Sequence, residues 1–114
     1  MEVHVERAPN FLVMRVSGDL RLWGRPGAQD RPLQMLREEP SLTGNVILNM
    51  SEITRLDTSG IGALVRVLIE CSKRSAELSV VLPTGVCGEA LRRLRVFDAC
   101  PNFENEAAAI EKFR

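Results

Sequence analysis

Several residue types that would point to particular functions are rare or missing in this chain of 114 residues. It contains no tyrosine, one tryptophan, one histidine and three cysteines. Cys71, Cys87 and Cys100 form no CxxC pair and lie far along the chain from His4. We therefore expect neither a metal site nor a redox-active cysteine pair. Reduced thiols of a cytoplasmic protein fit this pattern better.

The chain also lacks a long apolar run and an excess of charge. No run approaches the roughly eighteen residues of a membrane span. The first residues, MEVHVERAPN, have no apolar middle of the kind found in signal peptides. Fifteen basic residues balance fifteen acidic ones, which disfavours attraction of the whole molecule to nucleic acid. A cytoplasmic protein without direct membrane insertion and without a nucleic-acid partner is expected.

The residues that are present have the composition of one globular domain, expected to span residues 1–114. Hydrophobic residues make up 45% of the chain and charged residues 26%. Apolar patterns predict a hairpin of residues 2–7 and 10–17, a helix in PLQMLREE, a strand in NVILNM, a helix from Asp57 to about Ser75, a strand in ELSVVLP, a helix in GVCGEALRRLRVF, a strand in DACPNF and a helix in ENEAAAIEKFR. This β-β-α-β-α-β-α-β-α order predicts an α/β fold, in which helices pack on a mixed, mostly parallel sheet of about five strands.

The two longer helices should each bury an apolar face. In the first, the inward residues predicted from helical spacing are Ile61, Leu64, Val65, Leu68 and Ile69. In the second they are Val86, Ala90, Leu91 and Leu94. Glu70 and Arg74 have the spacing of a helical ion pair, and Asn105 is a candidate cap of the last helix.

The stretch Asp-Thr-Ser-Gly-Ile-Gly, residues 57–62, opens the longest predicted helix. Its simplest interpretation is a helix cap, with Asp57 accepting a hydrogen bond from an amide of the first turn. Two features go beyond a cap. Hydroxyl residues follow Asp57 directly, and Gly60 and Gly62 weaken the helix by about 1 kcal/mol each relative to alanine. Small residues here would let another backbone approach, and a hydroxyl at a helix start can carry a phosphate.

The stretch from NVILNM to ELSVVLP, with this motif inside it, resembles the central part of the STAS domain, the fold of bacterial anti-sigma factor antagonists. The family motif of Asp, a hydroxyl residue, Ser, Gly, a hydrophobic residue and Gly matches Asp57, Thr58, Ser59, Gly60, Ile61 and Gly62. FLVMRVSGDL is similar to the second strand of the family and its Gly-Asp/Glu-Leu ending.

The resemblance implies a binding protein that acts as a switch rather than an enzyme. It implies an anti-sigma factor that is also a serine/threonine kinase as partner, a phosphatase that resets the switch, and no cofactor. Phosphorylation is expected at Thr58, with Ser59 as second choice. Partner contacts are expected from the whole motif, residues 57–62, and a homodimer stays open.

The sequence departs from the family pattern after Asp19-Leu20. The segment that follows carries Arg21 and Trp23 in a predicted loop, where the family has an Asp and a polar helix. In the family this loop lies on the same side as the phosphorylation loop, so we add Asp19 and Trp23 to the expected partner surface. A tryptophan among arginines can anchor an interface; the alternative is that Trp23 covers the end of the sheet.

Two other functions stay open from the sequence. One is a STAS subunit of a signalling scaffold or a cytoplasmic accessory of a lipid-transport ABC system, in which the motif binds a partner without phosphorylation. The other is a small nucleotide-binding or hydrolytic enzyme. The sequence offers no phosphate-binding loop or catalytic residue set for it, since GVCGEALRR lacks the Lys and the spacing of a P-loop.

Overall fold

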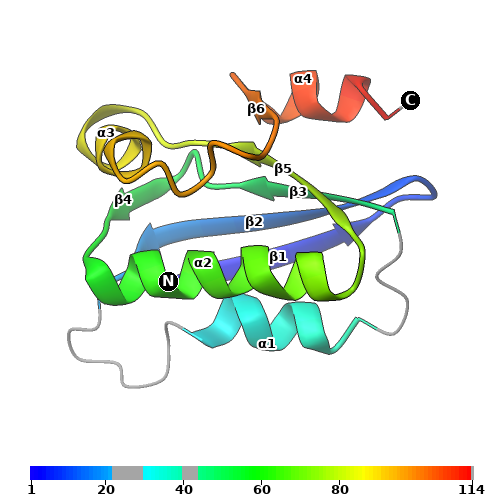
Figure 1. The fold of residues 1–114 in the computed structure, drawn as a ribbon, viewed down its shortest axis with the longest axis horizontal. Coiled ribbons are helices and arrows are strands. Elements are labelled where there is room, and N and C mark those ends of the chain that lie inside the picture. Colours follow the sequence, from blue (N-terminus) through cyan, green and yellow to red (C-terminus); the bar gives the residue numbers. More distant parts are fainter. Residues whose placement is uncertain (22–29, 40–43, 114) are drawn as a thin grey trace.

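Helices and strands alternate along the chain in the computed structural model, which describes residues 1–21, 30–39 and 44–113. The strands of this described part are β1 (Glu2–Arg7), β2 (Phe11–Asp19), β3 (Asn45–Asn49), β4 (Ile53–Arg55), β5 (Glu77–Val81) and β6 (Asn102–Phe103) (Figure 1). Its helices are α1 (Arg31–Arg37), α2 (Thr58–Lys73), α3 (Gly85–Arg93) and α4 (Glu106–Glu111). The predicted α/β fold is confirmed, with one strand, β4, that the sequence patterns did not reveal.

The sheet is mixed, as predicted. Its strand order is β1-β2-β3-β5-β6, and β4 pairs separately with β2. β2, β3, β5 and β6 run parallel, whereas β1 folds back on β2 as an antiparallel hairpin with Glu2 opposite Ser17. β4 lies parallel to the last residues of β2, with Asp19 opposite Arg55. This short pairing brings the end of β2 to the residues that precede α2.

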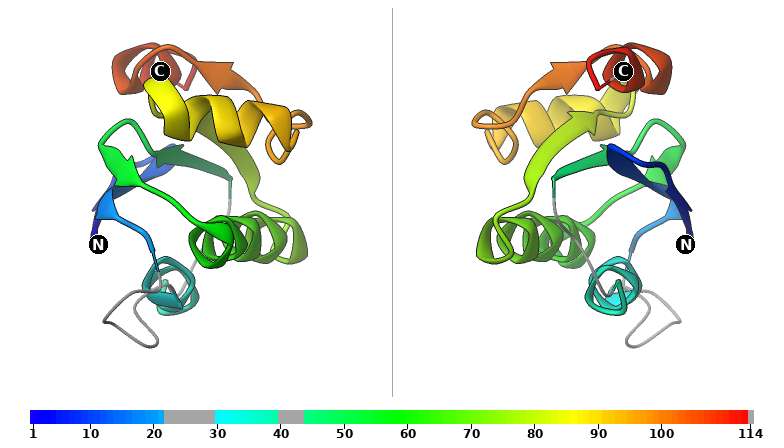
Figure 2. Two further views of the ribbon diagram at one scale, coloured as in Figure 1. Left: turned by 90° about the vertical axis from the view of Figure 1, so that its left-hand side faces the viewer. Right: turned by 90° about the vertical axis from the view of Figure 1, so that its right-hand side faces the viewer.

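The helices lie on both faces of the sheet (Figures 1 and 2). α1, α2 and α3 contribute to one apolar cluster with one face of the sheet, and α4 contributes to a second, smaller cluster on the other face. The first includes Leu36, Val46, Leu48, Leu64, Val67 and Leu91, and the second consists of Val13, Ile47, Val81 and Ala109 with half-buried neighbours. β3 and β5 therefore form the buried centre, as the apolar runs predicted.

The predicted inward faces of α2 and α3 are partly wrong. α2 buries Gly60, Ala63, Leu64, Val67 and Cys71, while Ile69 is 48% exposed. α2 is rotated about its axis relative to the predicted orientation, because its small residues Gly60 and Ala63 lie against the protein interior. In α3 the buried residues are Gly88 and Leu91, whereas Val86 and Leu94 are 83% and 58% exposed.

The packing of α3 explains the exposure of Val86 and Leu94. A Cβ atom at Gly88 would lie 1.9 Å from the carbonyl oxygen of Pro83, so this glycine face rests directly on the chain that precedes the helix. The side of α3 that carries Val86 and Leu94 consequently points away from the core. The helical spacing of apolar residues could not predict this orientation, because it takes no account of a close contact made by a glycine.

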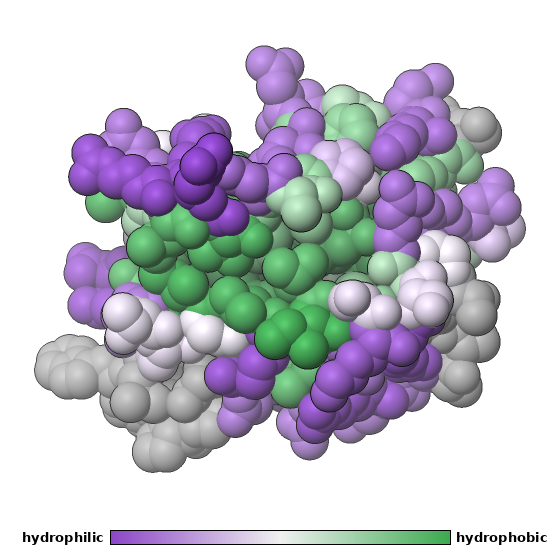
Figure 3. Space-filling model, in the orientation of Figure 1, coloured by the Kyte–Doolittle hydropathy of each residue, from purple (hydrophilic) through white to green (hydrophobic). Residues whose placement is uncertain are grey.

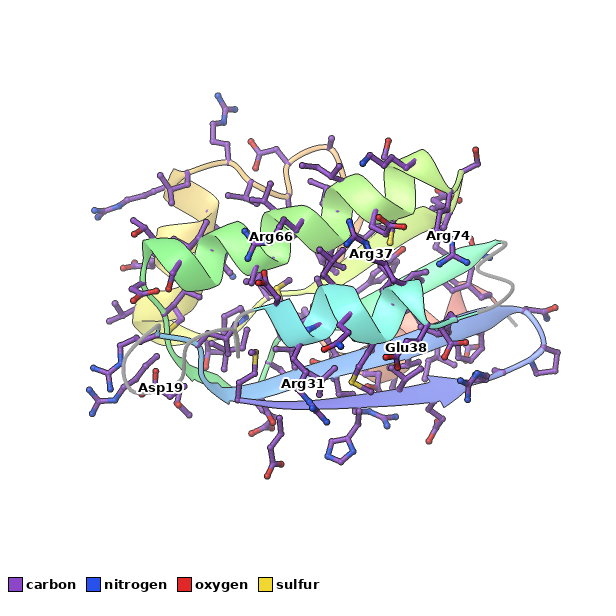
Figure 4. All side chains as sticks on the ribbon, turned by 90° about the horizontal axis from the view of Figure 1, so that it is seen from below. Asp19, Arg31, Arg37, Glu38, Arg66 and Arg74 are labelled. Carbon is purple, nitrogen blue, oxygen red and sulfur yellow. The ribbon has the colours of Figure 1, made fainter. Side chains whose placement is uncertain are left out.

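α1 and α2 are joined by arginine side chains (Figure 4). Arg74 donates hydrogen bonds to the carbonyl oxygens of Leu36, in the last turn of α1, and Glu39, just beyond its end, at 3.0 and 2.7 Å. Glu70 accepts a bond from Arg37, at 3.5 Å, instead of the predicted bond from Arg74. The predicted Glu70–Arg74 pair is therefore wrong, since contacts between helices replace it.

α4 is held on its face of the sheet by polar contacts. Asn105 caps it, as predicted, by accepting a hydrogen bond of 2.8 Å from the amide of Ala108. The Glu106 carboxylate accepts bonds from Arg15 of β2, at 2.7 and 2.8 Å, and from Asn49 of β3, at 2.9 Å. Within the described ranges no helix is both long and apolar enough to cross a membrane.

Candidate functional site

The start of α2 is organised by the carboxylate of Asp57. This residue is the N-cap, and its Oδ1 accepts a hydrogen bond of 2.9 Å from the amide of Gly60. The same oxygen accepts a bond of 2.6 Å from the hydroxyl of Ser59. The carboxylate thus satisfies one first-turn amide and fixes a neighbouring side chain, while its charge lies at the positive end of the helix. The predicted cap is confirmed.

The two hydroxyl residues of the motif have different surroundings. Thr58, the first residue of α2, is exposed, whereas Ser59 is half-buried and donates its hydroxyl hydrogen to Asp57. A modifying enzyme would reach Thr58 without disturbing the cap. Modification of Ser59 would break a contact that orders the turn. Of the two hydroxyl residues, Thr58 is therefore the more accessible.

The two glycines of the motif also differ. A Cβ atom at Gly60 would lie 2.4 Å from the carbonyl oxygen of Leu20 and 2.9 Å from its Cβ. Gly60 is buried, so the close approach that it allows is that of the chain's own backbone, and our expectation of a role in partner access is corrected for this residue. At Gly62 a Cβ would meet only the end of the Arg66 side chain, at 3.4 Å. Gly62 therefore has no comparable packing requirement.

A cluster of charges lies beside the motif at the ends of β2 and β4. Arg21 donates side-chain bonds to both carboxylate oxygens of Asp19, at 2.6 to 3.0 Å, and its amide donates a further bond of 2.9 Å. These bonds, with a smaller contribution from the charge of Arg55, lower the pKa of Asp19 to about 2. The charge of Asp57 contributes to the raised pKa of Arg21, after the larger effect of Asp19. Asp19 and Asp57 thus both act on the guanidinium of Arg21.

The structure brings most of the predicted site residues together. Residues 57–62 form one turn, and β4 pairing places Asp19 near them. Ile61 is half-buried beside the core, and Trp23 lies outside the described residues. Sequence reasoning missed Leu20 as the contact of Gly60; the Gly-Asp-Leu ending of β2 was the signal that could have pointed to it.

Metal-binding and cysteine chemistry receive no support from the described ranges. They contain no group of three or more histidine, cysteine or acidic side chains that could hold a metal ion. The three cysteines are free. Burial raises the pKa of the Cys71 thiol to about 12, which keeps it protonated and unreactive at neutral pH.

Comparisons with known proteins agree with this architecture. The family model described as the STAS domain matches residues 2–109. Among curated proteins, the chain is 28% identical over 101 residues to a probable sulfate transporter 3.4 of Arabidopsis thaliana. The match covers 82% of this chain but 16% of that protein, so the chain spans less than a fifth of its length.

Two solved structures are similar in fold. One is an anti-sigma factor antagonist from Mycobacterium paratuberculosis, with a TM-score of 0.75 at 17% identity over 99% of this chain and 93% of that one. The other is the anti-sigma factor antagonist SpoIIAA in its unphosphorylated form, with a TM-score of 0.70 at 14% identity over 97% and 95% of the two chains. At sequence identities of 17% and 14%, the structural similarity establishes the fold of this chain.

Proposed function

The chain belongs to the STAS domain family, and from this membership we propose that it is an anti-sigma factor antagonist. Its partner is an anti-sigma factor with serine/threonine kinase activity, which phosphorylates Thr58, and a phosphatase removes the phosphate. The chain itself acts by binding. The observation that carries the proposal is the exposed Thr58 directly after the capping Asp57, in a fold shared with two anti-sigma factor antagonists.

The proposed switch acts through charge at a contact surface. A phosphate on Thr58 adds a charge of about −1.5 to −2 at the start of α2. The helix end tolerates this charge, so the fold is retained. A partner that covers Thr58 would have to strip water from the phosphate and would place its own acidic groups against it. We therefore expect the phosphorylated chain to release its partner, with Asp57, Ile61 and Gly62 contributing to the unphosphorylated contact.

The test compares wild-type protein with Thr58→Glu as baits in lysate of the native host. Thr54→Glu is a matched control, because Thr54 is exposed and follows Ile53, whose side chain points into the core, so that it faces away from α2. We expect wild type and Thr54→Glu to retain a kinase-like anti-sigma factor and Thr58→Glu to lose it. Retention by all three proteins would contradict the switch.

A second candidate is a STAS module that binds other subunits without phosphorylation. It is favoured by the resemblance to part of a sulfate transporter, in which the matching segment is a small share of a larger protein. The same baits distinguish the two functions. Capture of transporter or scaffold subunits by wild type and Thr58→Glu alike, with Thr58 unmodified in the recovered protein, would favour the second candidate.

A further inference from the structure

β5 and β6 are parallel neighbours in the sheet, but the helices that follow them lie on opposite faces. α3 follows β5 and contributes to the first apolar cluster, whereas α4 follows β6 and contributes to the second. The chain therefore leaves the carboxyl ends of these two strands toward opposite faces. In open α/β sheets a crevice forms at such a point, and small molecules commonly bind in it.

A pocket of about 600 Å³ lies at these strand ends, and its volume is in the range of small-molecule sites. Its apolar lining is half-buried Leu82, directly after β5, and half-buried Phe103 of β6. Leu82 packs against the first apolar cluster and Phe103 against the second, so the pocket lies where the two faces of the sheet meet. None of its lining residues belongs to the motif of residues 57–62.

Two opposite charges line the pocket, those of Arg92 in α3 and Glu104 between β6 and α4. Neither forms an ion pair with the other or with another described residue. The Arg92 side chain extends back along α3, because its Nη1 lies 3.4 Å from the position of a Cβ at Gly88. That position is 1.9 Å from the carbonyl oxygen of Pro83, so the guanidinium lies near the segment that joins β5 to α3.

The three uncharged polar residues of the lining each keep a group without a hydrogen bond to the described part of the chain. Thr84 precedes α3 but does not cap it through its hydroxyl. Asn105 caps α4 with its oxygen, which leaves its Nδ2 as a donor. Asn102 donates from its Nδ2 to two carbonyl oxygens, which leaves its Oδ1 as an acceptor. The pocket thus offers donors from Arg92 and Asn105. It offers acceptors from Glu104 and Asn102.

Two further charged groups neighbour the lining residues without lining the pocket. Glu89 precedes Arg92 by one turn of α3 and forms no ion pair with it. Lys112 lies over the ring of Phe103, 5.8 Å from its centre. One group is acidic and the other basic, so their charges offset one another. Figure 3 shows mostly hydrophilic residues over α3 on the face drawn in Figure 1, which suits a ligand that carries charge.

We propose that this pocket binds a free α-amino acid with an apolar side chain. The carboxylate of the ligand pairs with Arg92, and its ammonium group pairs with Glu104. Its side chain packs on Leu82 and Phe103. A ligand with one sign of charge fits less well, because an anion such as a nucleotide would lie against Glu104 and a cation would lie against Arg92. The inference does not rest on the proposed function, since no residue of the motif takes part.

The test follows ligand binding by chemical-shift changes in NMR spectra of the ¹⁵N-labelled protein. The ligands are L-phenylalanine, N-acetyl-L-phenylalanine, which lacks the ammonium group, and L-phenylalaninamide, which lacks the carboxylate. The variants are Arg92→Gln and Glu104→Gln. Their matched controls are Arg93→Gln and Glu89→Gln, because these two residues are exposed and carry the same charges outside the pocket lining. All four positions are exposed, so circular dichroism should show wild-type folding.

We expect L-phenylalanine to bind wild type and both controls with a Kd of about 1 mM or lower. Loss of either charge, from the ligand or from the pocket, should weaken binding about tenfold. N-acetyl-L-phenylalanine should bind Glu104→Gln no more weakly than wild type, and L-phenylalaninamide should bind Arg92→Gln no more weakly than wild type, because each ligand lacks the group that the replaced residue pairs with.

Three results would overturn the proposal. The first is no binding of L-phenylalanine to wild type at about 10 mM ligand. The second is equal affinity for L-phenylalanine and N-acetyl-L-phenylalanine, since the pocket would then bind a simple carboxylate. The third is an equal loss of affinity in the control variants, which would place the ligand outside this pocket.

Discussion

Replacing Gly60 by alanine tests the packing that positions the start of α2. The added methyl would lie 2.4 Å from the carbonyl oxygen of Leu20 and 3.0 Å from a methyl of Leu56. Leu20 has little freedom to retreat, because its amide donates a bond of 2.9 Å to the carbonyl of Arg55 in β4. Alanine gains about 1 kcal/mol of helix propensity, but an overpacked site of this kind costs about 3 kcal/mol. We therefore expect a net loss of about 2 kcal/mol.

Gly62→Ala is the matched control for this prediction. It makes the same chemical change two residues later, where the new methyl meets only a movable arginine side chain at 3.4 Å. We expect its stability to equal or exceed that of wild type by up to about 1 kcal/mol. Thermal melts followed by circular dichroism should show Gly60→Ala about 8 °C below wild type, at about 4 °C per kcal/mol. A Gly60→Ala melting temperature at or above that of Gly62→Ala would refute the packing that we describe.

Three further predictions concern the cap, α4 and the exposed hydroxyl. Asp57→Ala should cost about 1 kcal/mol in urea unfolding through loss of the cap, and an unchanged midpoint would argue against the bond to Gly60. Glu106→Gln should cost about 1–2 kcal/mol, because the carboxylate accepts charge-assisted bonds from Arg15. These bonds lower the pKa of Glu106 below 4.5, so the wild-type protein should lose this part of its stability as the pH falls below about 4.5. If the free energy of unfolding fell equally with pH in wild type and Glu106→Gln, this prediction would be contradicted. Thr58→Glu should melt within about 2 °C of wild type, and an unfolded variant would show that the side chain is not exposed.

Much of the fold could be predicted because its signals are local. The apolar run NVILNM, the hairpin of β1 and β2 and the caps at Asp57 and Asn105 depend on neighbouring residues, and the structure confirms each. β4 could not be predicted in this way. It has three residues with one buried side chain, and it exists because the end of β2 supplies its hydrogen bonds.

The orientation of the helices was less predictable for a related reason. Helical spacing identifies apolar side chains, but glycine contacts decide which side rests on the core. Gly60 against Leu20 and Gly88 against Pro83 turn α2 and α3, so that Ile69 and Leu94 face outward. The motif of residues 57–62 was visible in the sequence, whereas the difference between Thr58 and Ser59 depends on the hydrogen bond to Asp57.

The central claim is that phosphorylation of Thr58 controls partner binding. The most direct measurement is phosphopeptide mapping of this chain isolated from its native host, after the partner-bound and free fractions have been separated by size. We expect phosphate on Thr58 in the free fraction and unmodified Thr58 in the bound fraction. Phosphate on Thr58 in the bound fraction, or unmodified Thr58 in both, would contradict it.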